Sequence, residues 1–298
     1  MPPSQPPIQA RGLGKRYGKV VALRDLSLDV LEGEVFGFLG PNGAGKTTTI
    51  RLLLGLIRPD AGSVTVLGRP AGGLGGVAAR ADVGFLPGDM AFWPALTGQE
   101  TLDFLAQLAG RPPAARQRLL EHLGLGAGEL ARPVRTYSDG MKQKLGLVQA
   151  LQCEPRLALL DEPTKGLDPL VQQAFYDIVT GLRGAGATVF LSSHVLPEVE
   201  RVCDRVAMLR AGVVVSLGDV ETLRRAERRR VSADFDADVD AASLAHFGDL
   251  VVAQPRHVEL LVAQASLPAL VARLGMLPLT DVAIERPTLE EAFLEHYR

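Results

Sequence analysis

GPNGAGKTT, residues 40–48, decides the fold of this chain, because it has the spacing G-x-x-x-x-G-K-[ST]. The apolar run VFGFL at 35–39 precedes it and predicts a buried strand. Apolar residues at helical spacing follow it and predict a helix: Ile50, Leu53, Leu54 and Ile57. A strand, this loop and a helix together direct backbone N–H groups and the positive end of the helix dipole at a polyphosphate. The stretch therefore predicts a phosphate-binding loop rather than a glycine-rich turn that matches the pattern by chance.

The residues of this loop are expected to hold phosphates and a metal ion. Glycine lets the backbone wrap closely around phosphate oxygens, where a side chain would interfere. Lys46 is the expected cation for the β- and γ-phosphates, and the Thr47 hydroxyl is an expected Mg²⁺ ligand. The expected nucleotide-binding residues of this stretch are Gly40, Pro41, Asn42, Gly43, Ala44, Gly45, Lys46, Thr47 and Thr48.

Composition limits the class of protein. The 298 residues are 47% hydrophobic, enough for one large and one small domain or for two of moderate size. A formal net charge of -2 does not suggest a nucleic-acid binder. The two cysteines, Cys153 and Cys203, have no metal-ligand spacing, which favours a reducing, cytosolic location. No apolar run approaches about 18 residues, so we expect any membrane-spanning part to belong to another polypeptide.

The segments on either side of the loop and its helix predict a β-rich start. Residues 11–30 predict antiparallel strands around a turn at Tyr17. Tyr17 is either an exposed aromatic residue or a surface on which adenine stacks, since an aromatic ring pairs well with a flat base. Downstream, residues 63–67 and 83–86 predict strands, and the glycine-rich stretch 71–76 predicts a surface loop.

Residues 92–152 predict a helical insert in an α/β domain. Thr97 and Glu100 form a T-x-x-E capping box ahead of an apolar helical face, and a second helix is expected around 115–123. The lone Trp93 at the start of this insert is either a core residue or an anchor for a partner protein.

Two further helices have recognisable start signals. Ser138 is suited to the N-cap of a helix over 138–152, which would leave the N-terminus of that helix free to bind an anion. Asp168 and Pro169 predict the N-cap and first residue of a helix that reaches residue 183.

Polar residues end two apolar strands in this half of the chain. Asp161 and Glu162 follow the aliphatic strand predicted over 156–160, and buried carboxylates are costly unless they meet a cation or a reacting group. A further strand over 188–191 leads into SSH at 192–194.

The last third of the chain predicts a linker and a second domain. A hairpin is expected over 206–217 and a linker helix over 219–230. The linker carries a basic cluster, which is either a solvated helix face or a contact for anionic lipid headgroups. The cluster consists of Arg224, Arg225, Arg228, Arg229 and Arg230.

Residues 231–298 predict a separate small α+β domain. Strand-like stretches alternate with helical ones at 241–247 and 267–274 in the order strand-helix-strand-strand-helix-strand. That order suggests a ferredoxin-like unit, closed by a final helix from Thr288.

Several classes of protein use a phosphate-binding loop, among them kinases, GTPases, motor ATPases and transport ATPases. A GTPase needs an N-K-x-D guanine reader, but the only asparagine of the chain is Asn42. The order of motifs is more informative: Tyr17, GPNGAGKTT at 40–48, the helical insert, YSDGMKQK at 137–144, LALLDEP at 157–163, GLD at 166–168 and SSH at 192–194. With these motifs, residues 8–218 resemble an ATP-binding cassette (ABC) ATPase.

The resemblance implies an α/β fold of the P-loop NTPase type, with a mixed sheet core, an antiparallel β subdomain and a helical insert. Tyr17 matches the adenine-stacking position, and residues 40–48 match the phosphate cradle. Asp161 matches the carboxylate that helps to hold Mg²⁺, Glu162 the base that orients the attacking water, and His194 the switch histidine that contacts the γ-phosphate.

Three further matches imply a second subunit. Ser138 and Gly140 match the signature motif, whose helix N-terminus caps the γ-phosphate bound by the other subunit in this family. Asp168 matches the loop that crosses between subunits. Because the chain has one cassette, the resemblance implies a head-to-tail homodimer around two ATP molecules and their Mg²⁺ ions.

The chain departs from the family pattern at two places. After VGFLP the family usually has a glutamine that reaches Mg²⁺, but here Gly88 and Asp89 follow, and Asp89 is a candidate replacement ligand. The signature motif has Asp139 and Met141 where glycine and glutamine are commoner, and an acidic group near a phosphate is unfavourable unless it turns away.

The resulting hypothesis is the ATP-hydrolysing subunit of a bacterial ABC transporter, on the inner face of the cell membrane, with a separate permease. The ending RPTLEEAFLEHYR at 286–298 resembles the drug- and antibiotic-export branch, which favours export. The main alternative is a soluble ABC ATPase of translation or DNA maintenance, although such proteins usually have two cassettes or long coiled-coil insertions. A small-molecule kinase is a third alternative, but it leaves the signature helix and His194 unexplained.

Overall fold

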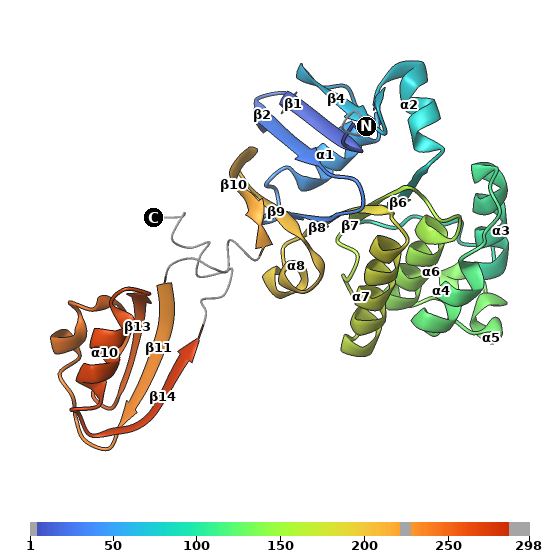
Figure 1. The fold of residues 1–298 in the computed structure, drawn as a ribbon. Coiled ribbons are helices and arrows are strands. Elements are labelled where there is room, and N and C mark those ends of the chain that lie inside the picture. Colours follow the sequence, from blue (N-terminus) through green and yellow to red (C-terminus); the bar gives the residue numbers. More distant parts are fainter. Residues whose placement is uncertain (1–4, 221–227, 286–298) are drawn as a thin grey trace. The chain divides into compact units, whose positions relative to one another are not determined.

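The computed structural model describes residues 5–220 and 228–285 of the chain. Contacts within the chain divide it into two compact units, Met1–Leu217 and Gly218–Arg298 (Figure 1). Among the described residues, no helix is both long enough and apolar enough to cross a membrane.

A six-stranded sheet forms the centre of the first unit, with the strand order β10-β9-β3-β8-β7-β6. Neighbouring strands from β9 to β6 in this order are parallel. All residues of β3, β7 and β8 are buried, which explains why these strands are continuous apolar runs in the sequence. The strands are β3 (Val35–Leu39), β6 (Val83–Leu86), β7 (Leu157–Asp161), β8 (Thr188–Ser193), β9 (Arg205–Arg210) and β10 (Val213–Asp219).

A second, antiparallel sheet has the order β2-β1-β4-β5. Its strands are β1 (Ile8–Tyr17), β2 (Val20–Val30), β4 (Ala61–Val66) and β5 (Arg69–Pro70). Helix α1 (Lys46–Leu53) contacts both sheets and lies between them (Figure 1). One core cluster joins Leu26 of the second sheet to Phe36 and Phe190 of the first, so the two sheets share a single hydrophobic core.

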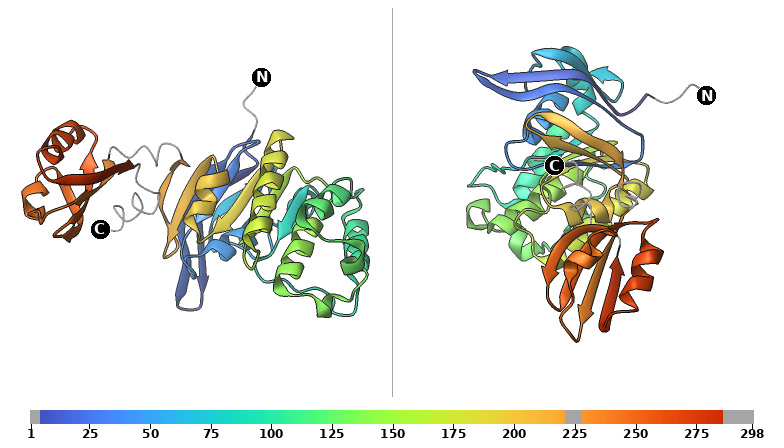
Figure 2. Two further views of the ribbon diagram at one scale, coloured as in Figure 1. Left: turned by 90° about the horizontal axis from the view of Figure 1, so that it is seen from below. Right: turned by 90° about the vertical axis from the view of Figure 1, so that its left-hand side faces the viewer.

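The helical insert follows β6 and is drawn in green in Figures 1 and 2. Its elements are α3 (Gly98–Ala109), α4 (Arg116–Leu123), α5 (Ala127–Leu130), the 3-10 helix η1 (Val134–Thr136) and α6 (Asp139–Leu151). The unit is completed by α2 (Gly73–Arg80), α7 (Pro169–Gly184) and α8 (Leu196–Val202). The fold is therefore the predicted α/β arrangement of mixed sheet, antiparallel subdomain and helical insert.

The predicted helix starts agree with the structure. Thr97 caps α3 in a complete capping box with Glu100, and the Ser138 hydroxyl accepts a hydrogen bond from Met141 N at the start of α6. Asp168 accepts hydrogen bonds from two backbone N–H groups of α7. The surface loop predicted over 71–76 was wrong, because α2 begins at Gly73 within it.

The C-terminal unit contains the sheet β12-β13-β11-β14, in which all neighbours are antiparallel. Its elements are β11 (Arg228–Phe235), the 3-10 helix η2 (Ala241–Leu244), β12 (Gly248–Gln254), β13 (His257–Ala263), α10 (Leu267–Leu274) and β14 (Leu279–Glu285). Leu270 and Leu274 of α10 belong to a core formed with the sheet, and α10 lies on one face of that sheet (Figure 2).

The C-terminal unit differs from the sequence predictions at two of its segments. The helix expected over 241–247 is only the short turn η2. Residues 228–230 of the predicted linker helix belong to β11, because β13 offers their backbone a partner from Leu261 to Ala263. Residues 221–227, with Arg224 and Arg225, and the final helix predicted from Thr288 lie outside the described residues.

Candidate functional site

The candidate site lies where three parallel strands end. Asp161 at the end of β7 pairs in register with Ser192 of β8, and Ser192 pairs with Phe38 of β3 on its other side. The segments that follow these strands therefore meet at one edge of the sheet. A cavity of about 720 Å³ opens there, within the range of roughly 300–1,000 Å³ that is usual for small-molecule sites. Predicted site residues that line it are Asn42, Thr47, Asp89, Asp161, Glu162 and His194.

The loop after β3 can be built only with glycine at key positions. Gly45 has φ 114, and a Cβ there would lie 2.6 Å from the carbonyl oxygen of Ala22. A Cβ on Gly40 would lie 2.4 Å from the carbonyl oxygen of Leu209. The loop ends at Lys46, the first residue of α1, so the helix N-terminus with its unpaired N–H groups adjoins the cavity.

Lys46 is buried beneath this loop. Its Nζ donates hydrogen bonds to Gly40 O at 2.6 Å and Pro41 O at 3.3 Å, and lies 3.6 Å from Glu162 Oε1. Burial lowers the pKa of Lys46, while the charges of Glu162 and Asp161 act in the opposite direction. The side chain is therefore a desolvated cation beside the cavity, where an anion would be attracted strongly.

Asp161 joins the loop to β8. Its Oδ2 accepts a hydrogen bond from Thr47 Oγ1 at 2.9 Å, and its Oδ1 accepts one from the Ser192 hydroxyl. A hydroxyl and a carboxylate side by side are the hard oxygen donors that Mg²⁺ prefers, and Mg²⁺ commonly keeps several waters. In the described part of the chain, no group of three or more His, Cys, Asp or Glu side chains could hold a metal. The pair Thr47 and Asp161 thus fits a Mg²⁺ ion that is shared with phosphates.

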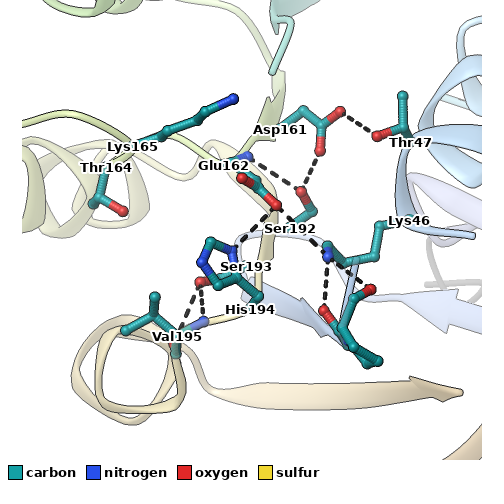
Figure 3. A network of polar contacts seen from close by, with 12 residues as sticks. Lys46, Thr47, Asp161, Glu162, Thr164, Lys165, Ser192, Ser193, His194 and Val195 are labelled. Atoms are coloured by element: carbon teal, nitrogen blue, oxygen red, sulfur yellow. Dashed lines mark hydrogen bonds and ion pairs between the residues drawn. The ribbon is translucent and has the colours of Figure 1, made fainter. Parts of the chain in front are cut away.

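Glu162 lies at the centre of the polar network in Figure 3. Its Oε1 is 3.2 Å from His194 Nδ1 as well as 3.6 Å from Lys46 Nζ. Its backbone is left-handed, with φ 50, and its N–H donates to the carbonyl and hydroxyl oxygens of Ser192, both at 3.2 Å. Strained backbone of this kind is concentrated at functional sites, where the surroundings hold it in place.

Four of the predicted site residues lie away from this network. Tyr17 is 46% exposed at the end of β1, with Lys15 Nζ 5.8 Å from its ring centre. Ser138 and Asp168 make the helix caps described above. A Cβ on Gly140 would lie 3.0 Å from Gly166 O, so the start of α6 closely approaches the loop before α7.

Both departures from the family pattern are visible in the structure. A Cβ on Gly88 would lie 3.3 Å from Asp161 Oδ2, so glycine leaves open a space next to the candidate metal ligand. The Asp89 side chain lines the cavity but is fully exposed and pairs with Lys165 Nζ at 3.4 Å. Asp139 is almost fully exposed and pairs with Lys142 at 3.2 Å, so its charge turns toward solvent.

Three residues of the site were not identified from the sequence. Ser192 holds Asp161 and Glu162, Lys165 lines the cavity, and Gln143 Nε2 donates to Glu162 O at 3.2 Å and Pro163 O at 2.8 Å. Gln143 connects α6 to the strand end that carries the carboxylates. The signal in the sequence that could have indicated Gln143 is a glutamine on the otherwise apolar face of the predicted helix.

Comparisons with known proteins agree with this geometry. A family model described as ABC transporter matches residues 23–165, and one described as EvrA-like ABC transporter, C-terminal domain, matches residues 227–285. An uncharacterized ABC transporter ATP-binding protein of Nostoc is 45% identical over 69% of the chain, and this chain spans 62% of its length.

Other matches cover more of both chains. The linearmycin resistance ATP-binding protein LnrL of Bacillus subtilis is 33% identical over 96% of the chain and 97% of its own length. A solved structure of an ATP binding subunit of an ABC transporter superposes with a TM-score of 0.68 and 32% identity, over 73% of this chain and 92% of that one. The site geometry, both family models and a relative matched along almost its whole length lead to one conclusion: the chain belongs to the family of ABC transporter ATP-binding proteins.

Proposed function

We propose that this chain binds ATP with Mg²⁺, hydrolyses it to ADP and phosphate, and couples the hydrolysis to a separate membrane permease that exports its cargo. The observation that carries the proposal is that Thr47, Asp161, Glu162 and His194 line one cavity, with Lys46 Nζ 3.6 Å from Glu162. Phosphoryl transfer requires mainly positioning and groups that stabilise the negative charge that develops on the phosphoryl oxygens.

Each side chain has a distinct role in this proposal. The backbone N–H groups of residues 40–48 and the N-terminus of α1 surround the phosphates, and Lys46 exchanges its contacts with loop carbonyls for phosphate oxygens. Thr47 and Asp161 hold Mg²⁺, which neutralises phosphate charge when it is bound. Glu162 orients the attacking water and accepts its proton, and His194 donates to the γ-phosphate.

Two copies of the chain complete each site in this proposal. Ser138 and Gly140 at the N-terminus of α6 would cap the γ-phosphate held by the second copy. Asp168, which caps α7, would lie in the contact between the two copies. Tyr17 would supply the surface for adenine.

The permease is proposed to contact the groove between β6 and the helical insert. This cavity of about 700 Å³ is lined by Phe85, Phe92, Trp93, Leu105 and Leu108. Trp93 is 50% exposed and stacks edge to face on Phe104 at 5.1 Å between ring centres, so its ring is only partly used in the chain's own packing. Such a contact would hold the chain at the cytoplasmic face of the membrane.

Export is the proposed direction of transport. LnrL is named as a resistance protein for linearmycin, and it matches this chain through both units. A role in translation or DNA maintenance is the competing proposal. Purification of the tagged chain separates the two, since a polytopic membrane protein would be retained in the first case and ribosomes or DNA in the second.

The Glu162→Gln substitution tests the hydrolysis step. The amide keeps the shape of the side chain but cannot accept the proton of water. We expect ATP binding to persist while steady-state hydrolysis falls at least about 100-fold, by the usual scale for loss of a general base. Glu200→Ala in α8 is a control that should retain hydrolysis. An unchanged rate in Glu162→Gln would rule out the assigned base.

A further inference from the structure

A buried carboxylate outside the cavity connects the two segments that carry Glu162 and His194. Glu198 lies in the first turn of α8 and is only 9% exposed. It forms no ion pair with any described residue. Both of its oxygens instead accept hydrogen bonds from hydroxyl groups, Oε1 from Thr164 and Oε2 from Ser193 at 2.8 Å. A buried carboxyl group is costly unless its oxygens are hydrogen-bonded, so the two hydroxyl partners of Glu198 require an explanation.

The two hydroxyl groups come from different strand ends. Thr164 lies two residues after Glu162, in the segment that leaves β7. Ser193 is the last residue of β8 and immediately precedes His194. Both are buried, and Figure 3 shows Thr164 near Lys165 and Ser193 next to His194 and Val195.

Ser193 also fixes the backbone on the far side of the histidine. Its Oγ accepts a hydrogen bond from Val195 N at 2.9 Å while it donates to Glu198. On the other segment, Leu167 N donates to Thr164 O at 3.0 Å. Glu198 therefore joins two turns, each of which is closed by its own hydrogen bond.

We propose that Glu198 is a positioning residue that sets the placement of Glu162 relative to His194. This inference rests on the proposed ATPase function. Hydrolysis needs the base and the histidine aligned on the same phosphoryl group, and small misplacements of reacting groups reduce rates strongly. Among the described residues, Glu198 forms no hydrogen bond or ion pair with Lys46, Thr47 or residues 40–45, so we expect ATP binding to depend little on it.

The proposal predicts a split between catalysis and binding. In the full-length chain, Glu198→Ala should lower kcat about tenfold or more, while the Kd for a fluorescent ATP analogue changes less than about twofold. Glu198→Gln, which can accept one hydroxyl hydrogen bond and donate to the other hydroxyl oxygen, should recover part of the rate. Glu200→Ala on the same helix is the matched control and should leave both quantities near the wild-type values.

A double-mutant cycle tests whether the effect runs through Thr164. Thr164→Val removes the hydroxyl with little change in volume and should lower kcat, whereas Thr164→Ser should retain it. In the Glu198→Ala background, Thr164→Val should have little further effect, because the bond is already absent. Additive losses in kcat would overturn the proposal, and so would a folded Glu198→Ala variant with kcat within about twofold of wild type.

Hydrogen exchange provides a readout that does not depend on hydrolysis. In Glu198→Ala, or in Thr164→Val if the first variant does not fold, the amides of Val195 and Leu167 should both exchange faster than in wild type. Unchanged exchange at both would overturn the proposal. A wild-type chain that never hydrolyses ATP would refute the proposed function instead, and the exchange comparison would still decide the role of Glu198.

Discussion

Gly43 and Gly45 in the phosphate-binding loop both have left-handed backbone, but their surroundings differ. Gly43 has φ 81 and open space where a Cβ would be, whereas a Cβ on Gly45 would lie 2.6 Å from Ala22 O and 2.8 Å from Leu23 Cδ2. Residues of β2 therefore limit the space at Gly45, whereas at Gly43 only the left-handed backbone favours glycine.

These two glycines give a matched pair of substitutions. Gly43→Ala should lower the free energy of unfolding by about 1–2 kcal/mol, the usual cost of a left-handed conformation for a residue with a Cβ. Gly45→Ala should cost more, because the clash with Ala22 O adds to that strain. Chemical denaturation of both variants measures the difference in the free energy of unfolding. Equal decreases would mean that the backbone at Ala22 shifts at no cost to accommodate the Cβ of residue 45.

His257 in the C-terminal unit provides a prediction about pH. Its Nδ1 is 2.7 Å from Asp234 and its Nε2 3.3 Å from Glu259, which also pairs with Arg230 at 2.8 Å. The hydrogen bond with Asp234, followed by that with Glu259, raises the pKa of His257 above its ordinary 6.5. The folded state thus favours the protonated ring. The stabilisation that the protonated ring gains from these contacts is fully present below pH 6.5 and is lost as the pH rises through the raised pKa of His257.

The test compares the thermal unfolding of wild type and His257→Asn at pH values from below 6.5 to above the raised pKa of His257. The stability difference should be largest at acidic pH and should shrink as the pH rises. In an Asp234→Asn background the pH dependence should become weaker. A difference that grows with pH would contradict the assignment of the protonated ring.

At the scale of secondary structure, helix starts could be predicted because a cap is a local feature. The T-x-x-E spacing at Thr97, the serine at 138 and the Asp-Pro pair at 168 all depend on residues within one turn. Helix α2 was missed because glycine-rich sequence normally indicates a loop. Here Gly76 is required inside the helix by a close approach, since a Cβ on it would lie 1.8 Å from Ala71 O, so glycine does not mark a loop.

The same difference between local and tertiary signals applies to the site. The spacing of the loop residues, and the carboxylates and histidine at strand ends, could be recognised along the chain. Ser192 and Gln143 could not, because their roles depend on the register of β8 against β7 and on the face that α6 presents to the strand end. The path of residues 228–230 likewise depends on pairing with β13.

The cap of α3 gives a prediction at this scale. Thr97→Ala removes the hydroxyl that accepts a hydrogen bond from Glu100 N at 3.1 Å, and should cost about 1 kcal/mol of stability. Thr97→Ser should retain most of that stability. Equal stability of the alanine and serine variants in denaturant would show that the cap contributes nothing to the whole chain.

At the scale of the whole molecule, the groups proposed to meet a nucleotide are divided between two surfaces. Thr47 and Asp161 line the cavity, whereas Ser138 at the start of α6 forms no hydrogen bond with residues 40–48 of its own chain among the described residues. Only a second copy would bring both surfaces to one γ-phosphate in the proposed arrangement.

Dimerisation should therefore depend on ATP and Mg²⁺. The Glu162→Gln variant, which retains bound ATP in the proposed mechanism, should sediment as a dimer with both present and as a monomer without them. Adding Ser138→Arg, which places a bulky cation at the N-terminus of α6, should prevent the dimer. A Glu162→Gln chain that stays monomeric with ATP, Mg²⁺ and its permease would contradict the proposed assembly.

The left-handed backbone of Glu162 places the stability of the chain and its proposed catalysis in conflict at one position. At ordinary sites alanine is more stabilising than glycine, because glycine gains more freedom on unfolding. With φ 50 that order should reverse, so in chemical denaturation the free energy of unfolding of Glu162→Gly should exceed that of Glu162→Ala by roughly 1 kcal/mol, and neither variant is expected to hydrolyse ATP. The backbone conformation at this position thus favours glycine over a residue with a side chain, so the glutamate is explained by its proposed action on ATP rather than by local backbone preference.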